Sequence, residues 1–493
     1  MDTTKTRPPS LVYFAVFNPT FGQTEKTSAD QICFFHPASM SLNEKSRQVG
    51  LAQALVHFTR TFSPSHPCDT VHTRKHRVIL YQPEPGYWML LKVRLGTRTR
   101  STRLSKVEYL ESELQDSILK RVLERSYEFF KFLYKGFDHV AQTQSIIILK
   151  KTLEEFFTSY IPRIDVASLD LVNAMCGIHF ASLDKSSYLQ ISSFVHDLQS
   201  QFPILRHVCF LWHDQLVWSG LESFQDLKCV YDFLTDPETG RVYDPIVNQV
   251  KRKGEPVIAT RRMGLRAPRQ PKMTLGRKGQ RFSGYLVGPT NPSMAGANVE
   301  MKSVYIGNQA VEHYLVVYQF EEECTLVFLV PPSSTVDVDP TDKKPPETDI
   351  RNGEFYVHLA GFLDERLRSL SGVLSEGWTN ARHLGEFADQ HFRYLYYNSM
   401  NLAFKTSIGA YKSTVLTPDL ITCVDTMHDD FMSLHAGHPN ELCIKTASDA
   451  WVVGRRSEDR ELFMVFPKSD ATLVDIDDEV KKFTMAYFSD VLQ

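Results

Sequence analysis

One group of residues in this 493-residue chain has the spacing that zinc binding would need. Cys68, His72 and His76 repeat at every fourth position, which on a single helix would align three possible ligands. Pro67 precedes them and strand-forming residues follow, so a continuous helix is disfavoured there. In a strand these side chains would lie too far apart to close one tetrahedron. We therefore predict no metal site here, but a solvated approach to a strand.

Two further groups have side chains that could bind metal or take part in acid–base chemistry. The cluster His428, Asp429, Asp430, His435 and His438 is typical of a helix end that runs into a loop. The run Glu321–Glu323 fits a charged hairpin tip. Motifs for phosphate-binding loops, dinucleotide-binding folds, serine nucleophiles and zinc helices are all missing from the sequence. We predict no catalytic residue, no metal and no cofactor, and a chain that works by binding.

The composition is that of a folded protein with ample core. Apolar residues make up 42% and aromatic residues 12%, and the net charge is −3. These values exclude a disordered or collagenous chain, and no overall field points to nucleic acid. Eight scattered cysteines without a Cys-x-x-Cys pair favour reduced thiols. With no signal-like or membrane-spanning apolar run, we expect a cytosolic protein of about three domains.

Two stretches interrupt the globular pattern. Residues 251–281 hold eleven Lys or Arg against the single Glu255, and residues 331–353 are rich in Pro, Asp and Thr. We interpret the first as an insertion inside a domain and the second as a linker. The insertion suits an anionic membrane surface, where each cation adds about 1 kcal/mol before screening by salt, or it is a solvated loop. Nucleic acid is disfavoured because stacking aromatics are missing there. The membrane-binding candidates are Lys251, Arg252, Lys253, Arg261, Arg262, Arg266, Arg269 and Lys272.

Between these breaks, strands and helices recur in three α+β blocks of antiparallel sheets with packed helices. The expected boundaries are 8–165, then 166–334 with the basic insertion at 248–281, a linker at 335–353, and 354–493. In the first block a helix is expected over 43–62, with an apolar face at helical spacing formed by Leu51, Leu55, Phe58 and Phe62. Other expected elements are a strand over 177–182, a helix over 355–374 and a last helix capped by Asp477.

Seven runs, in order from the first block to the last, resemble one family. They are Asn18–Gly22, Asn43–Lys45 with Val49–Leu51, Phe58–Pro64, Asp214–Leu221, Tyr396–Ala403, Trp451–Gly454 and Glu479–Lys482. The chain is similar to the calcium–caffeine–zinc sensitivity (Ccz-one) family of vacuolar fusion proteins. That resemblance implies three longin domains, each an antiparallel sheet flanked by helices. The basic insertion has no counterpart that we can place in the family.

The resemblance also implies a function and partners. It implies a subunit of a guanine-nucleotide exchange factor for the late-endosomal Rab GTPase (Rab-seven), acting in endosome maturation and in endosome or autophagosome fusion with lysosomes. The implied obligate partner is a Mon-one-type triple-longin protein, and a propeller-plus-solenoid third subunit joins in animals. Recruitment would be peripheral, to late-endosomal, lysosomal or vacuolar membranes. By family analogy the platform lies on the paired first longin domains, where we choose the helix over 43–62 and the strand over 87–94. The interface candidates are Asn43, Glu44, Lys45, Leu51, Phe58 and Trp88.

Three alternatives remain open at this stage. Trp88 is either a partner-facing anchor or a core aromatic residue. The chain is either part of an exchange factor or a longin-type scaffold or tether without exchange activity, which nucleotide-release measurements distinguish. An unrecognised hydrolase would be indicated by a deep polar pocket with perturbed ionisable groups.

Overall fold

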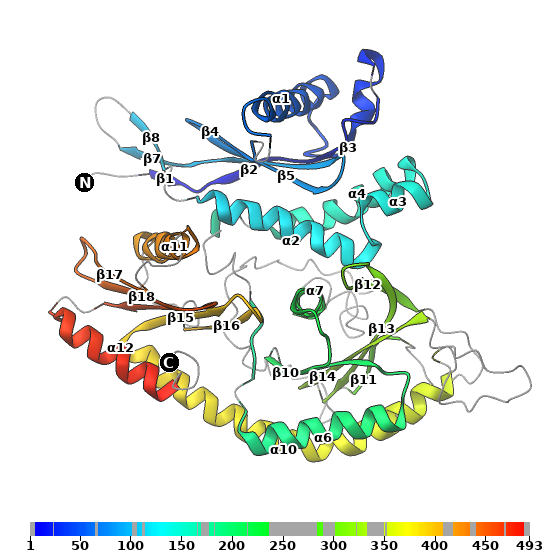
Figure 1. Ribbon diagram of the computed structural model, residues 1–493, viewed down its shortest axis with the longest axis vertical. Helices are drawn as coiled ribbons and strands as arrows, with labels where there is room; N and C mark the ends of the chain where they lie inside the picture. Colours follow the sequence, from blue (N-terminus) through cyan, green and yellow to red (C-terminus); the bar gives the residue numbers. More distant parts are fainter. Residues whose placement is uncertain are drawn as a thin grey trace, which may run out of the picture. The chain divides into compact units, whose positions relative to one another are not determined.

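The computed structural model (Figure 1) forms two compact units, one built mainly from residues 1–175 and the other mainly from residues 176–493. The residues that the structure describes are 5–22, 24–64, 68–100, 106–110, 114–164, 166–168, 177–181, 183–213, 215–235, 283–288, 301–321, 323–332, 350, 353–407, 418–433, 440–467 and 470–487. No helix among them is both long enough and apolar enough to span a membrane.

The first unit is built on a five-stranded antiparallel sheet of order β3-β2-β6-β5-β4. Its strands are β2 (Ser10–Phe17), β3 (Ile32–His36), β4 (Thr70–Thr73), β5 (His76–Glu84) and β6 (Tyr87–Arg94). The short helix η1 (Glu25–Gln31) precedes β3, and α1 (Leu42–Arg60) covers one face of the sheet (Figure 1). The helices that follow β6 are α2 (Asp116–Tyr134), α3 (Phe137–Thr143) and α4 (Ile146–Tyr160). A three-stranded ribbon extends the unit through β1 (Lys5–Arg7), β7 (Gly96–Arg100) and β8 (Lys106–Leu110).

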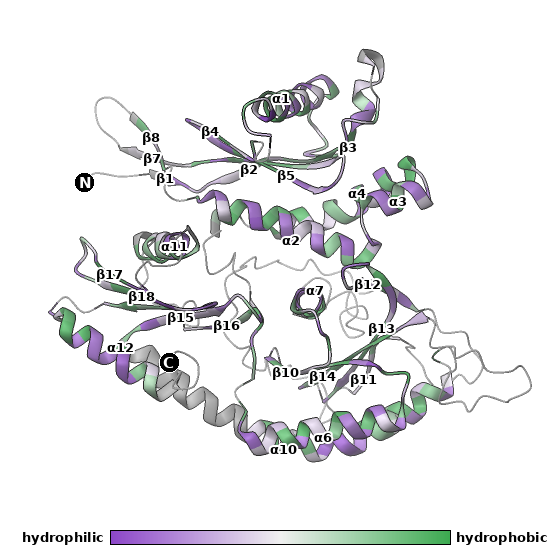
Figure 2. Cartoon of the chain, in the orientation of Figure 1, coloured by the Kyte–Doolittle hydropathy of each residue, from purple (hydrophilic) through white to green (hydrophobic). Residues whose placement is uncertain are grey.

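Each face of this sheet buries its own set of side chains. On the α1 face, Val49, Ala52 and Val56 of the helix pack on a cluster that includes Tyr13 and Leu80. On the other face the core is aromatic: Phe157 of α4 lies 4.8 Å from Phe14 and 5.3 Å from Phe34 between ring centroids. Helix α2 carries both hydrophobic and hydrophilic residues (Figure 2), and its buried residues Leu119, Leu123, Tyr127 and Phe130 follow at intervals of three and four, as in an amphipathic helix packed on a sheet.

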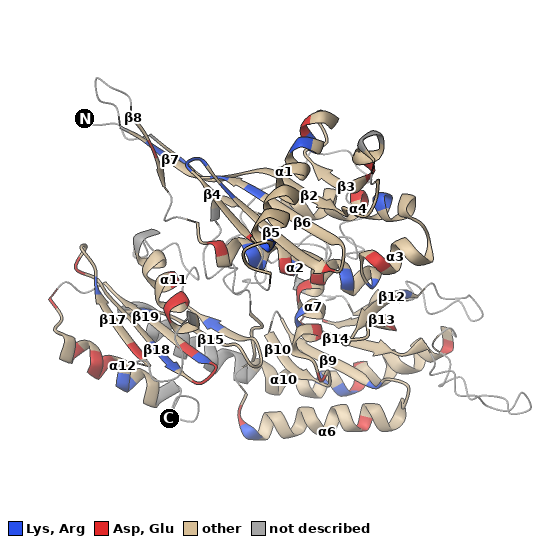
Figure 3. Cartoon of the chain, turned by 45° about the horizontal axis from the view of Figure 1, so that its top comes forward, with Lys and Arg blue, Asp and Glu red and all other residues tan. Residues whose placement is uncertain are grey.

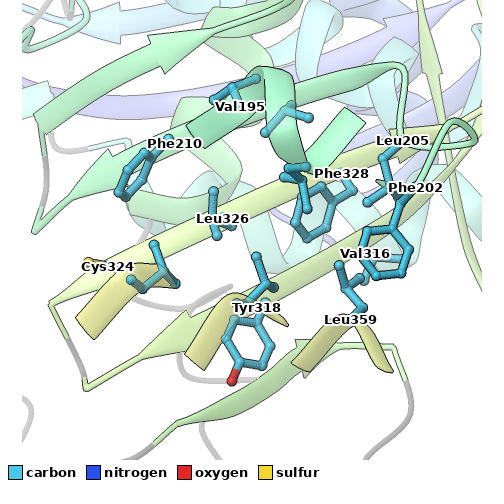
Figure 4. Packing of buried hydrophobic residues seen from close by; sticks show 14 of the residues in the cluster. Val195, Phe202, Leu205, Phe210, Val316, Tyr318, Cys324, Leu326, Phe328 and Leu359 are labelled. Carbon is cyan, nitrogen blue, oxygen red and sulfur yellow. The ribbon is translucent and has the colours of Figure 1, made fainter. Parts of the chain in front are cut away.

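The second sheet is antiparallel, with the order β10-β9-β14-β13-β11 and with β12 also paired to β13. Its strands are β9 (His207–Trp212), β10 (Gln215–Ser219), β11 (Gly284–Val287), β12 (Lys302–Ile306), β13 (Val311–Phe320) and β14 (Cys324–Val330). Its helices are α6 (Lys185–Gln201), α7 (Phe224–Thr235) and α10 (Gly353–His391). Side chains of α6, α10 and the sheet interdigitate in one cluster, with Val195, Phe210, Phe328 and Leu359 among them (Figure 4).

The third sheet has the order β16-β15-β19-β18-β17. Its elements are β15 (Arg393–Asn398), β16 (Ala403–Thr406), α11 (Pro418–Ser433), β17 (Glu441–Lys445), β18 (Trp451–Ser457), β19 (Arg460–Phe466) and α12 (Leu473–Tyr487). Ile476, Val480 and Phe483 of α12 pack on one face of the sheet. On the other face, the ring of Phe431 from α11 lies 5.9 Å from that of Phe463.

The three sheets share one topology. When β12, which lies off the main path and pairs with β13, is left out of the numbering, the strands of each sheet numbered in chain order lie side by side as 2-1-5-4-3 in all three cases. A helix always connects the second strand to the third: α1, α7 and α11 respectively. The expected α+β architecture of three antiparallel sheets flanked by helices is therefore confirmed.

The long helix α10 differs from the expected one in length and in packing. It runs from Gly353 to His391, past the expected end at 374. Phe355, Leu363 and Leu374 are buried in the cluster of the second sheet. The expected boundary at residue 354 would assign this helix to the third block, whereas its buried face packs in the second.

The expected cap of the last helix was wrong. Helix α12 begins at Leu473, and the hydroxyl of Thr472 accepts a hydrogen bond from the amide of Asp475 at 3.3 Å. The carboxylate of Asp475 accepts one from the amide of Thr472 in return, so the pair caps the helix reciprocally. Asp477 lies inside the helix, where it pairs with Arg455 and Lys481.

Residues 177–181 form a strap and not the expected regular strand. The amide of Ile178 donates to the carbonyl of Leu402 at 2.7 Å, and that of Ala181 donates to Leu216 at 2.8 Å. The strap thus bridges β16 of the third sheet and β10 of the second. At Gly177 an added Cβ would lie 2.3 Å from Cβ of Phe404, so only glycine fits there.

Candidate protein interface

The outward face of α1 carries a row of exposed apolar side chains. Leu51, Phe58 and Phe62 are 57%, 61% and 75% exposed. Leu51, Ala54 and Phe58 follow at intervals of three and four residues, so they lie on one side of α1, and Phe62 comes two residues after its last residue, Arg60. The rings of Phe58 and Phe62 contact each other edge to face, with centroids 5.0 Å apart. We call Leu51, Ala54, Phe58 and Phe62 the outer stripe.

The inward face of the same helix is apolar too, but its residues are smaller. Val49, Ala52 and Val56 are buried against the sheet, which brings the helix close to the strands. Ser41 caps the first turn by accepting a hydrogen bond from the amide of Glu44. Because the inner face already completes the core, the outer stripe is left for contacts outside this sheet.

Trp88 lies beneath α1 and not on its surface. It is 7% exposed and belongs to the cluster between the helix and the sheet. The guanidinium carbon of Arg60 lies 5.6 Å from the centre of its ring, and Arg60 also donates to Gln82 at 3.3 Å. This position matches the core alternative for Trp88, which supports α1 from below.

The first turn of α1 divides its polar residues between two sides. Asn43 and Glu44 are exposed, and Glu44 lies 3.9 Å from Arg47 in an exposed ion pair. Lys45 turns towards the sheet, donates to the carbonyl of Ala38 at 3.1 Å and lies over the ring of Phe35. Of the six candidates, Leu51 and Phe58 therefore form the centre of one exposed surface, Asn43 and Glu44 lie at its polar end, and Lys45 and Trp88 are directed inward.

Phe62 belongs to this surface but was not among the predicted interface residues. Its helical spacing from Phe58 was the signal that could have identified it. The eight basic candidates between Lys251 and Lys272 lie outside the described residues.

Two of the histidines singled out in the sequence, His72 and His428, each pair with one neighbouring carboxylate. The Nε2 atom of His72 lies 2.6 Å from the carboxylate of Asp116, and Nδ1 of His428 lies 2.6 Å from that of Glu461 in a buried pair. Among the described residues, no group of three His, Cys, Asp or Glu side chains is placed to hold a metal ion. Burial raises the pKa of the Cys33 and Cys209 thiols to about 12, which keeps both protonated at neutral pH.

Two family models match the chain at its two ends. One, described as the first longin domain of INTU, CCZ1 and HPS4, matches residues 11–135. The other, described as Intu longin-like domain 3, matches residues 388–483. Together with the strand order shared by all three sheets, these matches define a protein built from three longin domains.

Curated relatives match nearly the full length of the chain. The vacuolar fusion protein CCZ1 homolog of Nematostella vectensis is 31% identical over 489 residues, which is 98% of this chain and 98% of that protein. The homolog from Xenopus tropicalis is 31% identical over 493 residues, 98% of this chain and 97% of its own length. The one from Dictyostelium discoideum is 27% identical over 97% of both chains. The chain therefore belongs to the CCZ1 family of vacuolar fusion proteins, as the seven sequence runs indicated.

Proposed function

We propose that this chain acts in vacuolar and endosomal membrane fusion as one subunit of a guanine-nucleotide exchange factor for the late-endosomal Rab GTPase. Its partner in this proposal is a Mon-one-type triple-longin protein, with a propeller-plus-solenoid third subunit in animals. The observation that carries the proposal is the outer stripe, an exposed apolar surface on the first longin domain.

Such an activity needs a binding surface and no covalent chemistry. An exchange factor binds the nucleotide-free GTPase more tightly than the loaded one, and this difference in affinity drives nucleotide release. To do so it must displace the GTPase segments that hold Mg²⁺ and the phosphates. In this proposal the apolar row of α1 pairs the first domain with the partner chain to form the exchange platform, because large apolar and aromatic side chains supply most of the energy of an interface.

Nucleotide release from the Rab tests the proposal directly. We expect rapid release of a fluorescent GDP analogue when this chain and the Mon-one-type partner are present together, and slow release with either chain alone. An increase of at least about a hundredfold corresponds to about 2.7 kcal/mol of differential stabilisation. If a well-folded complex accelerated release from no Rab, the chain would be a longin scaffold or tether.

We also propose that the basic segment 251–281 recruits the complex peripherally to anionic membranes. Its ten net positive charges would bind such a surface reversibly, in a manner weakened by salt. We expect deletion of residues 251–281 to lower co-sedimentation with phosphatidylserine vesicles by about tenfold or more at 0.1 M salt. Nucleotide release in solution should stay unchanged, which separates recruitment from exchange. Equal sedimentation of the two proteins would leave the segment as a solvated loop.

A further inference from the structure

A second surface of the first longin domain is basic and lies beside α1 on the same face of the sheet. In the pairing of β5 with β6, His76 is opposite Arg94 and Val78 is opposite Lys92. Alternate residues of a strand share a face, so Lys92 and Arg94 lie on the face that carries Trp88 and Leu90 beneath α1. Lys75 is exposed in the adjoining turn between β4 and β5, where blue residues gather in Figure 3. We call Lys75, His76, Lys92 and Arg94 the basic strip.

The positive charge of the basic strip is not balanced within the described structure. No described carboxylate lies within ion-pair distance of Lys75, Lys92 or Arg94. Burial, followed by the charges of Lys92, Arg94 and Lys75, lowers the pKa of His76. On the opposite face of the sheet, by contrast, Arg77 lies near the carboxylate of Asp116.

The basic strip lies at the foot of a helix, and this position limits what can reach it. The hydroxyl of Tyr13 donates to Gln48 of α1 at 3.2 Å, and Nζ of Lys92 lies 5.3 Å from the centre of the same Tyr13 ring. A helix with its side chains is roughly 10 Å across, so α1 stands above the sheet beside the strip. Because α1 stands above the sheet, it would keep a flat bilayer from reaching the basic strip. A narrow polypeptide segment can lie on the strip alongside the helix.

The floor between the cations is apolar. Val12, Val71 and Val78 are partly buried and pack against the cluster beneath α1. A ligand that complements both features has acidic groups for the cations and apolar side chains for the floor. In an extended segment, residues two apart are roughly 6.6 Å apart and point to the same side, which matches the spacing of Lys92 and Arg94 along β6.

From this combination we infer that the basic strip binds an extended acidic segment of a partner protein, in which carboxylates alternate with apolar residues. The inference does not depend on the exchange activity proposed above. It assigns to the first domain a second protein-binding surface, distinct from the outer stripe, whose affinity falls with salt because its contacts are charged and accessible to solvent.

A labelled peptide tests the inference with the full chain. The probe is a fluorescein-labelled peptide of alternating Glu and Val, with the same peptide carrying Lys in place of Glu as its control. We expect the acidic peptide alone to bind, and carbodiimide coupling to join its carboxylates to Lys75 and Lys92, identified by mass spectrometry. Couplings confined to lysines elsewhere, including those of residues 251–281, would overturn the inference.

The Kd of the acidic peptide for charge-reversed variants tests the inference quantitatively. Lys75→Glu with Arg94→Glu should weaken peptide binding about tenfold, because two attractions become repulsions. The matched control, Lys185→Glu with Arg368→Glu, reverses two exposed cations of the second unit and should change the Kd by less than twofold. If the reversed pair lowers the melting temperature, Lys75→Gln with Arg94→Gln replaces it. Equal effects of strip and control variants, or binding to phosphatidylserine vesicles without binding to the peptide, would refute a protein ligand.

Discussion

Replacing Leu51 and Phe58 by glutamate is expected to abolish stable assembly of this chain with the proposed Mon-one-type partner. Both side chains are more than half exposed on the outer stripe and make no contribution to the core beneath α1. Truncating a central apolar anchor typically costs about 2–4 kcal/mol of binding energy, and a charge in its place adds a desolvation penalty. The affinity should therefore fall by at least about a hundredfold, and nucleotide release by the mixed chains should fall with it.

The two substitutions should have little effect on the stability of the folded chain. Glutamate is a good helix former and position 51 points away from the sheet, so the melting temperature should stay within about 2 °C of the parent. Leu189→Glu on α6 is the matched control, since Leu189 is also 57% exposed but lies on the second domain. Pull-down and isothermal titration measure the binding. Full assembly by the double variant would show that the interface lies elsewhere.

The outer stripe also illustrates how far the sequence alone can specify a surface. The period of Leu51, Leu55, Phe58 and Phe62 predicted one apolar face. Leu51 and Phe58 are exposed as a surface row, but Leu55 is half-buried, and the helix expected over 43–62 is found over 42–60, so that it ends before Phe62. The sequence contains a second apolar row on the other side, Val49, Ala52 and Val56, and it is this row that packs on the sheet. Periodicity cannot rank two such rows, because the choice depends on how closely the helix must approach strands that are distant in sequence.

Patterns in neighbouring residues predicted most of the other helices and strands, and the errors arose where the structure depends on packing between residues distant in sequence. The hairpin of β13 and β14 follows from two apolar runs around an acidic turn, which is local information. The packing of α10 is different, since Phe355 and Leu363 are buried in one cluster with residues of α6 and of the second sheet, which are distant in sequence. Asp477 had the residue type of a cap, but Thr472 and Asp475 bond each other reciprocally and begin the helix one turn earlier.

Contacts between residues distant in sequence also stabilise the first longin domain, where Glu84 at the end of the β5–β6 hairpin bonds to α2 and α3. The carboxylate of Glu84 accepts hydrogen bonds from the hydroxyl of Tyr127 at 2.8 Å and from the amides of Phe137 and Asp138 at 2.6 and 2.8 Å. It thereby caps the first turn of α3 and ties the hairpin to the end of α2. Gly136 leaves room for it, since an added Cβ there would lie 2.6 Å from Glu84 Oε1.

Glu84→Ala should destabilise the first domain by about 3 kcal/mol, because one change removes three hydrogen bonds to a charged acceptor and leaves two amides uncapped. Gly136→Val should cost a similar amount, since its φ of 133° is unfavourable for a side chain and the new atoms would displace Glu84. The exposed Glu44→Ala is the control and should change stability by less than about 1 kcal/mol.

Hydrogen exchange at the amides of Phe137 and Asp138 measures this effect locally, which suits a chain of several domains whose unfolding is not a single transition. If the two positions act through one network, Glu84→Ala should add little to Gly136→Val, so that the double variant costs clearly less than the sum of the single ones. Strict additivity would mean that Gly136 is required for its backbone conformation alone. Exchange rates unchanged by Glu84→Ala would mean that water replaces the carboxylate as the cap of α3, and that the hairpin is held by the aromatic core on that face of the sheet.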